Sequence, residues 1–217
     1  MSQLSEQRFE DLLPPYLATI DKQRLKLGIE QFINSETKEK ALDYSGFYLR
    51  KAPDYLMQSD MLDSVKMVAW DDESKDFVSG FIPSVFISNT CDVNKDNRRS
   101  INKKEALFAP IIELEQYFND LREAGYSNGQ ITSFYNTLKL QDFSNLFYLP
   151  KNEKNSKEYI VFFDKISWSP IDEIIKDDSI NNVRFISLSN YGFYLFILKL
   201  SYHFCRVPEE VDRQEII

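Results

Sequence analysis

Histidine, cysteine and glycine are all scarce in this chain of 217 residues, which contains one, two and six of them respectively. The two cysteines, Cys91 and Cys205, are far apart in the sequence. Together with the single histidine, His203, they do not match the close ligand spacing of a zinc site. We predict no metal site, and no motif indicates a cofactor. Two cysteines behind a polar N-terminus that does not resemble a signal peptide are typical of reduced cytoplasmic thiols.

Long apolar runs and an excess of basic residues are also absent. The longest apolar stretch, residues 191–198, contains Gly192 and is followed by Lys199, so it is too short to cross a bilayer of about 30 Å. The chain has 34 acidic and 26 basic residues, and its formal net charge of −8 opposes non-specific binding to phosphate backbones or anionic membranes. We therefore expect a cytoplasmic protein without membrane contact.

The chain is nevertheless rich in core-forming residues. Apolar residues make up 43% of it and aromatic residues 14%, which is enough to bury a sizeable core and excludes wholesale disorder. We predict a helical N-terminal arm over residues 1–44 and a main domain over residues 45–217. The arm should contain a helix at residues 12–33, because apolar residues recur there near helical spacing. These residues are Leu13, Leu17, Ile20 and Leu27.

The pattern of the main domain predicts a mixture of strands and helices, an α+β protein. An αα-hairpin is expected at about residues 113–140, with Ser127 or Asn128 capping its second helix. A C-terminal helix at about residues 190–206 is apolar on most faces, so it should be buried or interfacial. Strands are predicted over residues 55–62 and 64–70 (a pair or one bent strand), 81–88, 106–112, 145–149, 158–163 and 184–188.

Four segments, in this order, resemble the motifs of one family. Residues 58–62 are similar to a Gly-Asp-hydrophobic opening strand, and residues 82–89 to an Arg-Pro-hydrophobic-Leu-Ser strand. Residues 108–111 fall where a strand ends in Pro-x-Thr, and residues 163–168 are similar to Asp-Gln-x-Lys-Ser-Ile. The family is that of the MazF/PemK toxins, which share a small SH3-like β-barrel with the gyrase-poisoning CcdB toxins. The resemblance covers about residues 55–175, and it implies such a barrel with an inserted αα-hairpin and flanking N- and C-terminal helices.

The departures from the family pattern fall on the residues that would contact phosphate. The family's ribonucleases place an arginine before the proline of the second motif, where this chain has Ile82. They place Thr or Ser after the proline of the third, where Ile111 and Ile112 follow Pro110. Cleavage by the ribose 2′-OH develops negative charge on a pentavalent phosphate, which a guanidinium stabilises bidentately. Isoleucine cannot do this, so ribonuclease activity of the family type is not expected. Ser59 also replaces the glycine of the first motif.

Cys91 and Asp92 directly follow a predicted strand, where a thiol beside a carboxylate is a candidate catalytic pair. His203 would complete a thiol–imidazole dyad if the final helix packed beside the end of that strand. However, a neighbouring carboxylate opposes formation of the thiolate nucleophile. Asn89 and Asp92 are also typical of turns in which the side chain bonds to nearby backbone groups. A turn is therefore the preferred interpretation of residues 89–92. For His203, a capping or core role is preferred.

The only concentration of basic residues lies in the polar loop over residues 92–104. These residues could contact a phosphate backbone, so they are candidates for a nucleic-acid site. No aromatic side chains are interleaved with them, in contrast to single-strand binding surfaces, and a solvated loop is the default interpretation. The four residues are Arg98, Arg99, Lys103 and Lys104.

The preferred hypothesis is a bacterial-type cytoplasmic binding or regulatory protein on a MazF/PemK-like barrel without the family's ribonuclease activity. The first alternative is a ribonuclease toxin or phage-defence component, a metal-independent endoribonuclease with a relocated nucleic-acid site. The second is a thiol-dependent enzyme that uses Cys91. Expected partners are a protein partner or inhibitor, RNA, and a second copy in a homodimer. The homodimer is suggested by family analogy and by the apolar C-terminal helix.

Overall fold

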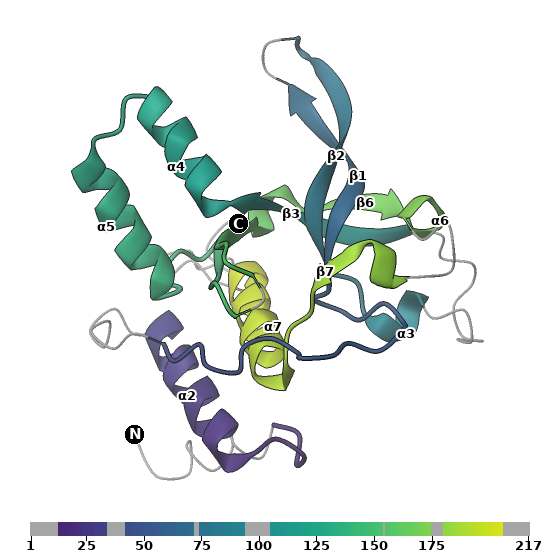
Figure 1. Cartoon of the computed structure of the whole chain (residues 1–217), viewed down its shortest axis with the longest axis vertical. Helices are drawn as coiled ribbons and strands as arrows, with labels where there is room; N and C mark the ends of the chain where they lie inside the picture. Colours follow the sequence, from purple (N-terminus) through teal and green to yellow (C-terminus); the bar gives the residue numbers. More distant parts are fainter. Residues whose placement is uncertain are drawn as a thin grey trace, which may run out of the picture.

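The computed structural model shows a mixed α+β protein built on one antiparallel sheet of seven strands (Figure 1). It describes residues 13–33, 42–71, 74–93, 105–153, 155–174 and 180–205. The strand order is β4-β5-β3-β2-β1-β7, and β6 pairs with β3 outside this path. The strands are β1 (Met61–Asp71), β2 (Asp76–Phe86), β3 (Glu105–Glu113), β4 (Leu146–Leu149), β5 (Tyr159–Phe162), β6 (Ser167–Pro170) and β7 (Arg184–Ile186).

The strand β3 organises the sheet because three other strands pair with it. On one edge it pairs with β2, but only over three residues of β2 at the end nearest the sheet centre. On the other edge β5 pairs with residues 111–113 and β6 pairs with residues 105–108. The 3-10 turn η2 (Phe163–Lys165) separates β5 from β6. The two strands therefore form one interrupted strand along β3, and the interruption lets the sheet bend.

The sheet curls but is not closed. Its outer strands are β4 and β7, and no backbone pairing joins them in the part of the chain that the structure describes. The curl brings the ring of Phe185 on β7 against the ring of Tyr159 on β5, with centroids 5.6 Å apart. The α+β class predicted from the sequence is thus confirmed, whereas the closed SH3-like barrel stays a prediction.

Helices cover both faces of the sheet, and alternation along β5 shows which helix covers which face. Val161 packs in a cluster with the C-terminal helix α7 (Asn190–Cys205), while Ile160 and Phe162 pack against the hairpin of α4 (Leu114–Glu123) and α5 (Asn128–Lys139). The N-terminal helix α2 (Thr19–Ile33) packs on α7. A third cluster fills the space beneath β1, β2 and β3. It includes Leu62, Val65, Met67, Phe86, Phe108, Ile174 of α6 (Ile171–Ile174) and Ile180 of η3 (Ile180–Asn182).

The predicted αα-hairpin and C-terminal helix are confirmed, and Ser127 is the cap. Its hydroxyl accepts from the backbone N–H of Gln130, while the side chain of Gln130 accepts from the backbone N–H of Ser127. The predicted N-terminal helix begins too early, because the chain forms a turn after Pro14 and α2 begins at Thr19. Ile20 and Leu27, which were placed on the apolar stripe, are exposed.

The strand predictions hold in most of the sheet, with three differences. The strand predicted from residue 55 is wrong over residues 55–60, where the chain turns between Met57 and Asp60 and β1 begins only at Met61. From there to residue 71 the chain is one bent strand, whose register with β2 shifts between Leu62 and Val65. The strand predicted over residues 81–88 is longer at its start, since β2 begins at Asp76. The short elements β6 and α6 were not predicted. None of the helices in the described ranges is long and apolar enough to cross a bilayer.

A buried ion pair fixes the start of β1 relative to β7. Arg184 donates to the carboxylate of Asp60 at 2.9 Å, and their side chains are 3% and 1% exposed. The carboxylate also accepts from the hydroxyl of Ser187 at 2.5 Å and from the backbone N–H of Met57 at 2.8 Å. Burial raises the pKa of Asp60, and these hydrogen bonds oppose that rise. The guanidinium also donates hydrogen bonds to the backbone carbonyls of Pro53 and Tyr55 and to the side-chain oxygen of Asn181.

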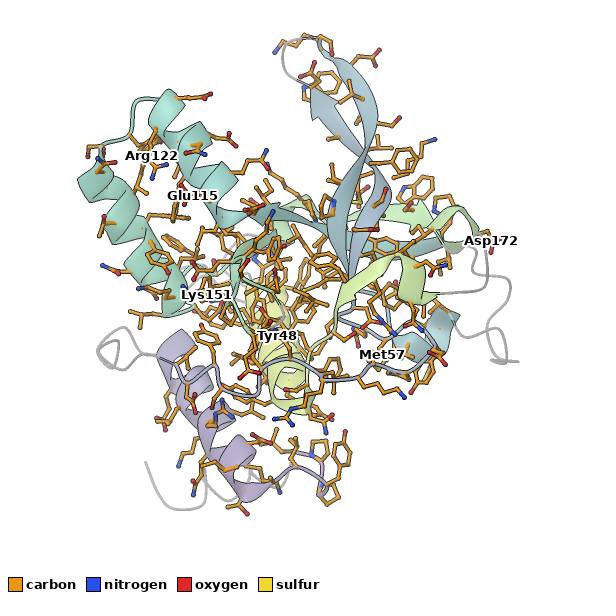
Figure 2. The ribbon with its side chains drawn as sticks, viewed as in Figure 1. Tyr48, Met57, Glu115, Arg122, Lys151 and Asp172 are labelled. Carbon is orange, nitrogen blue, oxygen red and sulfur yellow. The ribbon has the colours of Figure 1, made fainter. Side chains whose placement is uncertain are left out.

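Replacing Arg184 by methionine should destabilise the fold by about 3–5 kcal/mol, because it leaves the Asp60 carboxylate buried without its counter-charge. Urea unfolding measures the change. The control is Arg122→Met, since Arg122 pairs with Glu115 on the exposed surface of α4 (Figure 2) and such pairs contribute about 0–1 kcal/mol. A loss at Arg184 no greater than the loss at Arg122 would contradict the importance of the buried pair.

Candidate functional site

A groove of about 710 Å³ opens at the mouth of the curled sheet, between the β1–β2 hairpin and α4. Five strands contribute to it, and the mouth of a curled sheet is a common place for a ligand site. Most of its wall is apolar. The lining residues are Asp63, Met67, Val68, Ala69, Ile82, Pro83, Pro110, Ile111, Ile112, Glu113, Gln116, Asp120, Lys157, Tyr159, Phe162, Lys165 and Phe185.

The groove brings together the two positions that the family resemblance singled out. Ile82 and Pro83 line it from β2, and Pro110 and Ile112 line it from β3. These residues are neighbours because Ser84 of β2 pairs with Pro110 of β3, and the two antiparallel strands continue side by side from that pair. The wall at the expected phosphate-contacting positions is thus hydrocarbon, which offers no donor to an anion.

Charged residues lie at the rim of the groove, and their pairing limits what they can bind. Lys157 donates to Glu113 at 2.6 Å, and this hydrogen bond raises the pKa of Lys157. The ammonium of Lys165 lies 5.3 Å from the ring centroid of Phe162. Asp63 and Asp120 complete the rim, so the groove is mildly acidic as well as apolar.

The β1–β2 hairpin projects from the body of the protein beside this groove (Figure 1). Near its end the rings of Trp70 and Phe77 meet edge to face with centroids 5.3 Å apart, and they are directly opposite each other in the register. Such cross-strand aromatic pairs stabilise antiparallel strands. Large apolar side chains remain exposed along the hairpin: Val68, Trp70, Phe77, Val78, Phe81 and Ile82.

The candidate catalytic pair, Cys91 and Asp92, lies in the exposed helical turn α3 (Thr90–Val93). The side-chain oxygen of Asn89 accepts from the backbone N–H of Cys91 at 2.9 Å, and the carbonyl of Asn89 accepts from the N–H of Asp92 at 3.0 Å. The turn predicted from Asn89 is confirmed. The hydroxyl of Thr90 accepts from the backbone N–H of Gln58 at 2.8 Å, which ties the turn to the start of β1.

The third candidate, His203, is not brought to this turn. It lies in the last turn of α7, where its ring is 6.0 Å from Phe163 and 4.9 Å from Phe204. Figure 1 shows α3 well apart from α7. His203 is half-buried there, and the capping or core role stays a prediction. Among the residues that the structure describes, no three His, Cys, Asp or Glu side chains are grouped as metal ligands. Arg98, Arg99, Lys103 and Lys104 lie outside the described residues.

Sequence reasoning named part of the groove but missed its other walls. The apolar residues at Ile82 and Ile111 were noticed only as departures from a motif. Asp63, Lys157 and Phe185 come from distant segments and carry no local motif. The sequence feature that could have indicated a binding surface was the run from Phe77 to Ile82, since a solvated hairpin strand rarely carries apolar residues on both faces.

Lys199 of α7 is an unusual ionisable group, because it is fully buried in the core. Its ammonium donates to the backbone carbonyl of Gln141, which follows the end of α5 in a left-handed conformation with φ of 57°. Burial lowers the pKa of Lys199 to about 8, against the opposing charge of Asp142. Lys199 thus satisfies a backbone carbonyl just beyond the end of a helix.

No protein-family model matches this chain, and no curated protein matches it in sequence.

The stability contributed by Lys199 should depend on pH. Between pH 8 and about 10.5 the unfolded chain binds this proton more tightly than the native state does, so native stability rises with pH across that window. The rise should approach about 3 kcal/mol, at about 1.4 kcal/mol per pH unit. Comparing urea unfolding of the native chain and Lys199→Met from pH 7 to 10.5 isolates the effect, because other titrating groups are common to both. Parallel pH profiles would disprove it.

Proposed function

We propose that this protein is a cytoplasmic binding or regulatory protein that uses a MazF/PemK-like curled sheet without ribonuclease chemistry, and that it holds a segment of a partner protein in the groove. One observation carries the proposal. The two positions where the resemblance expects phosphate-contacting groups, Ile82 and Ile112, lie together in a groove whose wall is mostly apolar. An apolar concave site with a few charged groups at its rim suits an apolar segment better than a polyanion.

The electrostatics of the groove support the same conclusion. Stabilising a pentavalent phosphate requires donors aimed at its oxygens, and the loss of one such donor costs about 2.7–4 kcal/mol of transition-state stabilisation. Lys157 is already paired with Glu113. Asp63 and Asp120 would repel a phosphate backbone that entered the groove.

Mixed-sequence RNA incubated with the purified protein, without added metal, should remain as intact as RNA incubated with heat-inactivated protein. Gel electrophoresis of the products measures this. Cleavage that disappears in an Arg98→Ala/Arg99→Ala double variant would contradict the proposal and favour a ribonuclease with a relocated site. Cleavage that persists in the double variant would also contradict it and place the activity elsewhere in the chain.

The groove itself should bind an uncharged apolar dye such as Nile red, and Ile82→Asp should weaken that binding at least about fivefold, because it places a charge on the apolar wall. Fluorescence titration measures the affinity. The matched control is Leu107→Asp, since Leu107 is also exposed, at 44%, but does not line the groove. Equal effects of the two substitutions would show that the dye does not report the groove.

A further inference from the structure

Among the residues that the structure describes, nothing pairs with the outer edge of β2 along most of its length. β2 pairs with β1 from Asp76 to Val85, but with β3 only from Ser84 to Phe86. From Asp76 to Pro83, the edge that faces away from β1 has no strand partner within the described ranges. At roughly 3.3 Å per residue this edge is about 26 Å long, which suits a segment of about six to eight residues. The edge leads directly into the groove, since Ile82 and Pro83 belong to both.

Large apolar side chains are exposed on both faces of this edge. Phe77 and Phe81 point to one face and are 68% and 65% exposed, while Val78 and Ile82 point to the other and are 46% and 37% exposed. Proteins usually protect an exposed edge with charged residues, a bulge or a covering segment. No charged residue lies between Phe77 and Pro83. An edge of this length and composition is therefore suited to being covered by another chain.

We propose that the outer edge of β2 receives an extended segment of a partner protein as an added strand, and that this segment is apolar in its middle and flanked by lysine or arginine. The inference rests on the proposed binding function and specifies its mode. In strand addition the backbone hydrogen bonds provide affinity, and alternate side chains provide specificity. One row of side chains on the added strand would face Phe77 and Phe81, and the other row would face Val78 and Ile82.

Charge complementarity supports basic flanks. Asp76 lies at the outer end of the edge, and Asp63 and Asp120 lie on the groove walls at its inner end. Cationic residues at both ends of an added strand would therefore meet carboxylates. A second copy of this chain is less suitable, because its own Asp76 would approach the same acidic groove and like charges in opposed strands are destabilising. The formal net charge of −8 adds to that repulsion.

The experiment uses the full chain and a synthetic probe peptide in which threonine and valine alternate between two pairs of lysines. Two further peptides carry N-methyl groups on alternate residues, in one phase or the other, so that one row or the other of backbone N–H groups is blocked. Binding is measured by isothermal titration calorimetry. We expect one phase of methylation to weaken binding at least about tenfold and the other phase to change it little, because only one row of N–H groups faces β2.

Replacing the lysine flanks by glutamate should weaken binding about tenfold at about 0.1 M salt. The difference should shrink at about 1 M salt, where the Debye length falls from about 10 Å to about 3 Å. On the protein side, Val78→Ser/Phe81→Ser should weaken binding of the parent peptide at least about tenfold. The matched control is Trp168→Ser, an exposed aromatic residue on β6 that should leave binding unchanged.

The outcomes separate this inference from the proposed function. Equal sensitivity to both phases of methylation, or no binding of the parent peptide, overturns strand addition; the groove is then judged by the Nile red titration alone. Sedimentation that shows a concentration-dependent dimer lost in Val78→Ser/Phe81→Ser assigns the edge to a second copy and also overturns the inference. Nile red binding that Ile82→Asp leaves unchanged contradicts the proposed function instead.

Discussion

The buried ion pair of Asp60 and Arg184 is the constraint on which the groove depends. Asp60 directly precedes β1, and its backbone carbonyl accepts from the N–H of Phe86 at the end of β2. Arg184 begins β7, and Ser187 follows that strand and donates to the same carboxylate. Asp60 thus joins three strands, because its carboxylate holds β7 while its backbone carbonyl holds the end of β2 at the start of β1. This junction holds the curl that brings Phe185 to Tyr159 and forms the mouth of the sheet.

The same junction explains why the hairpin can be both ordered at its base and open at its edge. Near the base, β2 is held on both sides, by β1 and by β3. Farther out, β1 is the one strand of the described residues that pairs with β2, and the aromatic contact of Trp70 with Phe77 supports the end of the hairpin. An isolated two-stranded hairpin is marginally stable in water. A third strand along the open edge would add both backbone hydrogen bonds and apolar contacts where the hairpin has fewest.

Local signals in the sequence predicted the elements that depend on local interactions. Ser127 and Gln130 form a capping box at short range, and the apolar run of the final helix needs no partner to be recognised. The early start predicted for α2 was wrong because apolar spacing was extended through Pro14, where the chain turns instead. The beginning of β2 was missed because Ser79 and Gly80 interrupt its apolar pattern, and glycine is a poor strand former.

The groove could be predicted only in part, because its walls converge through tertiary structure. Ile82 and Pro110 were identified from motif positions, and their strands pair next to each other. Lys157 and Phe185 line the groove only because β5 pairs with β3 and because the buried ion pair of Arg184 holds β7 beside β1. No spacing in the sequence encodes that convergence, since it arises from the curl of the whole sheet.

The matches and mismatches with the MazF/PemK motifs divide by physical role. Ser59 occupies the position of the motif's glycine and has a φ of 74°, the left-handed region that glycine adopts most easily, and the adjacent Asp60 anchors the sheet. These two residues determine the backbone conformation just before β1 and the position of that strand in the sheet. Ile82 and Ile112 depart from the motif, and both line the groove. Under the proposed function, the sheet retains the backbone features of the motifs while its groove is lined by apolar residues, because fold and function are specified by different residues.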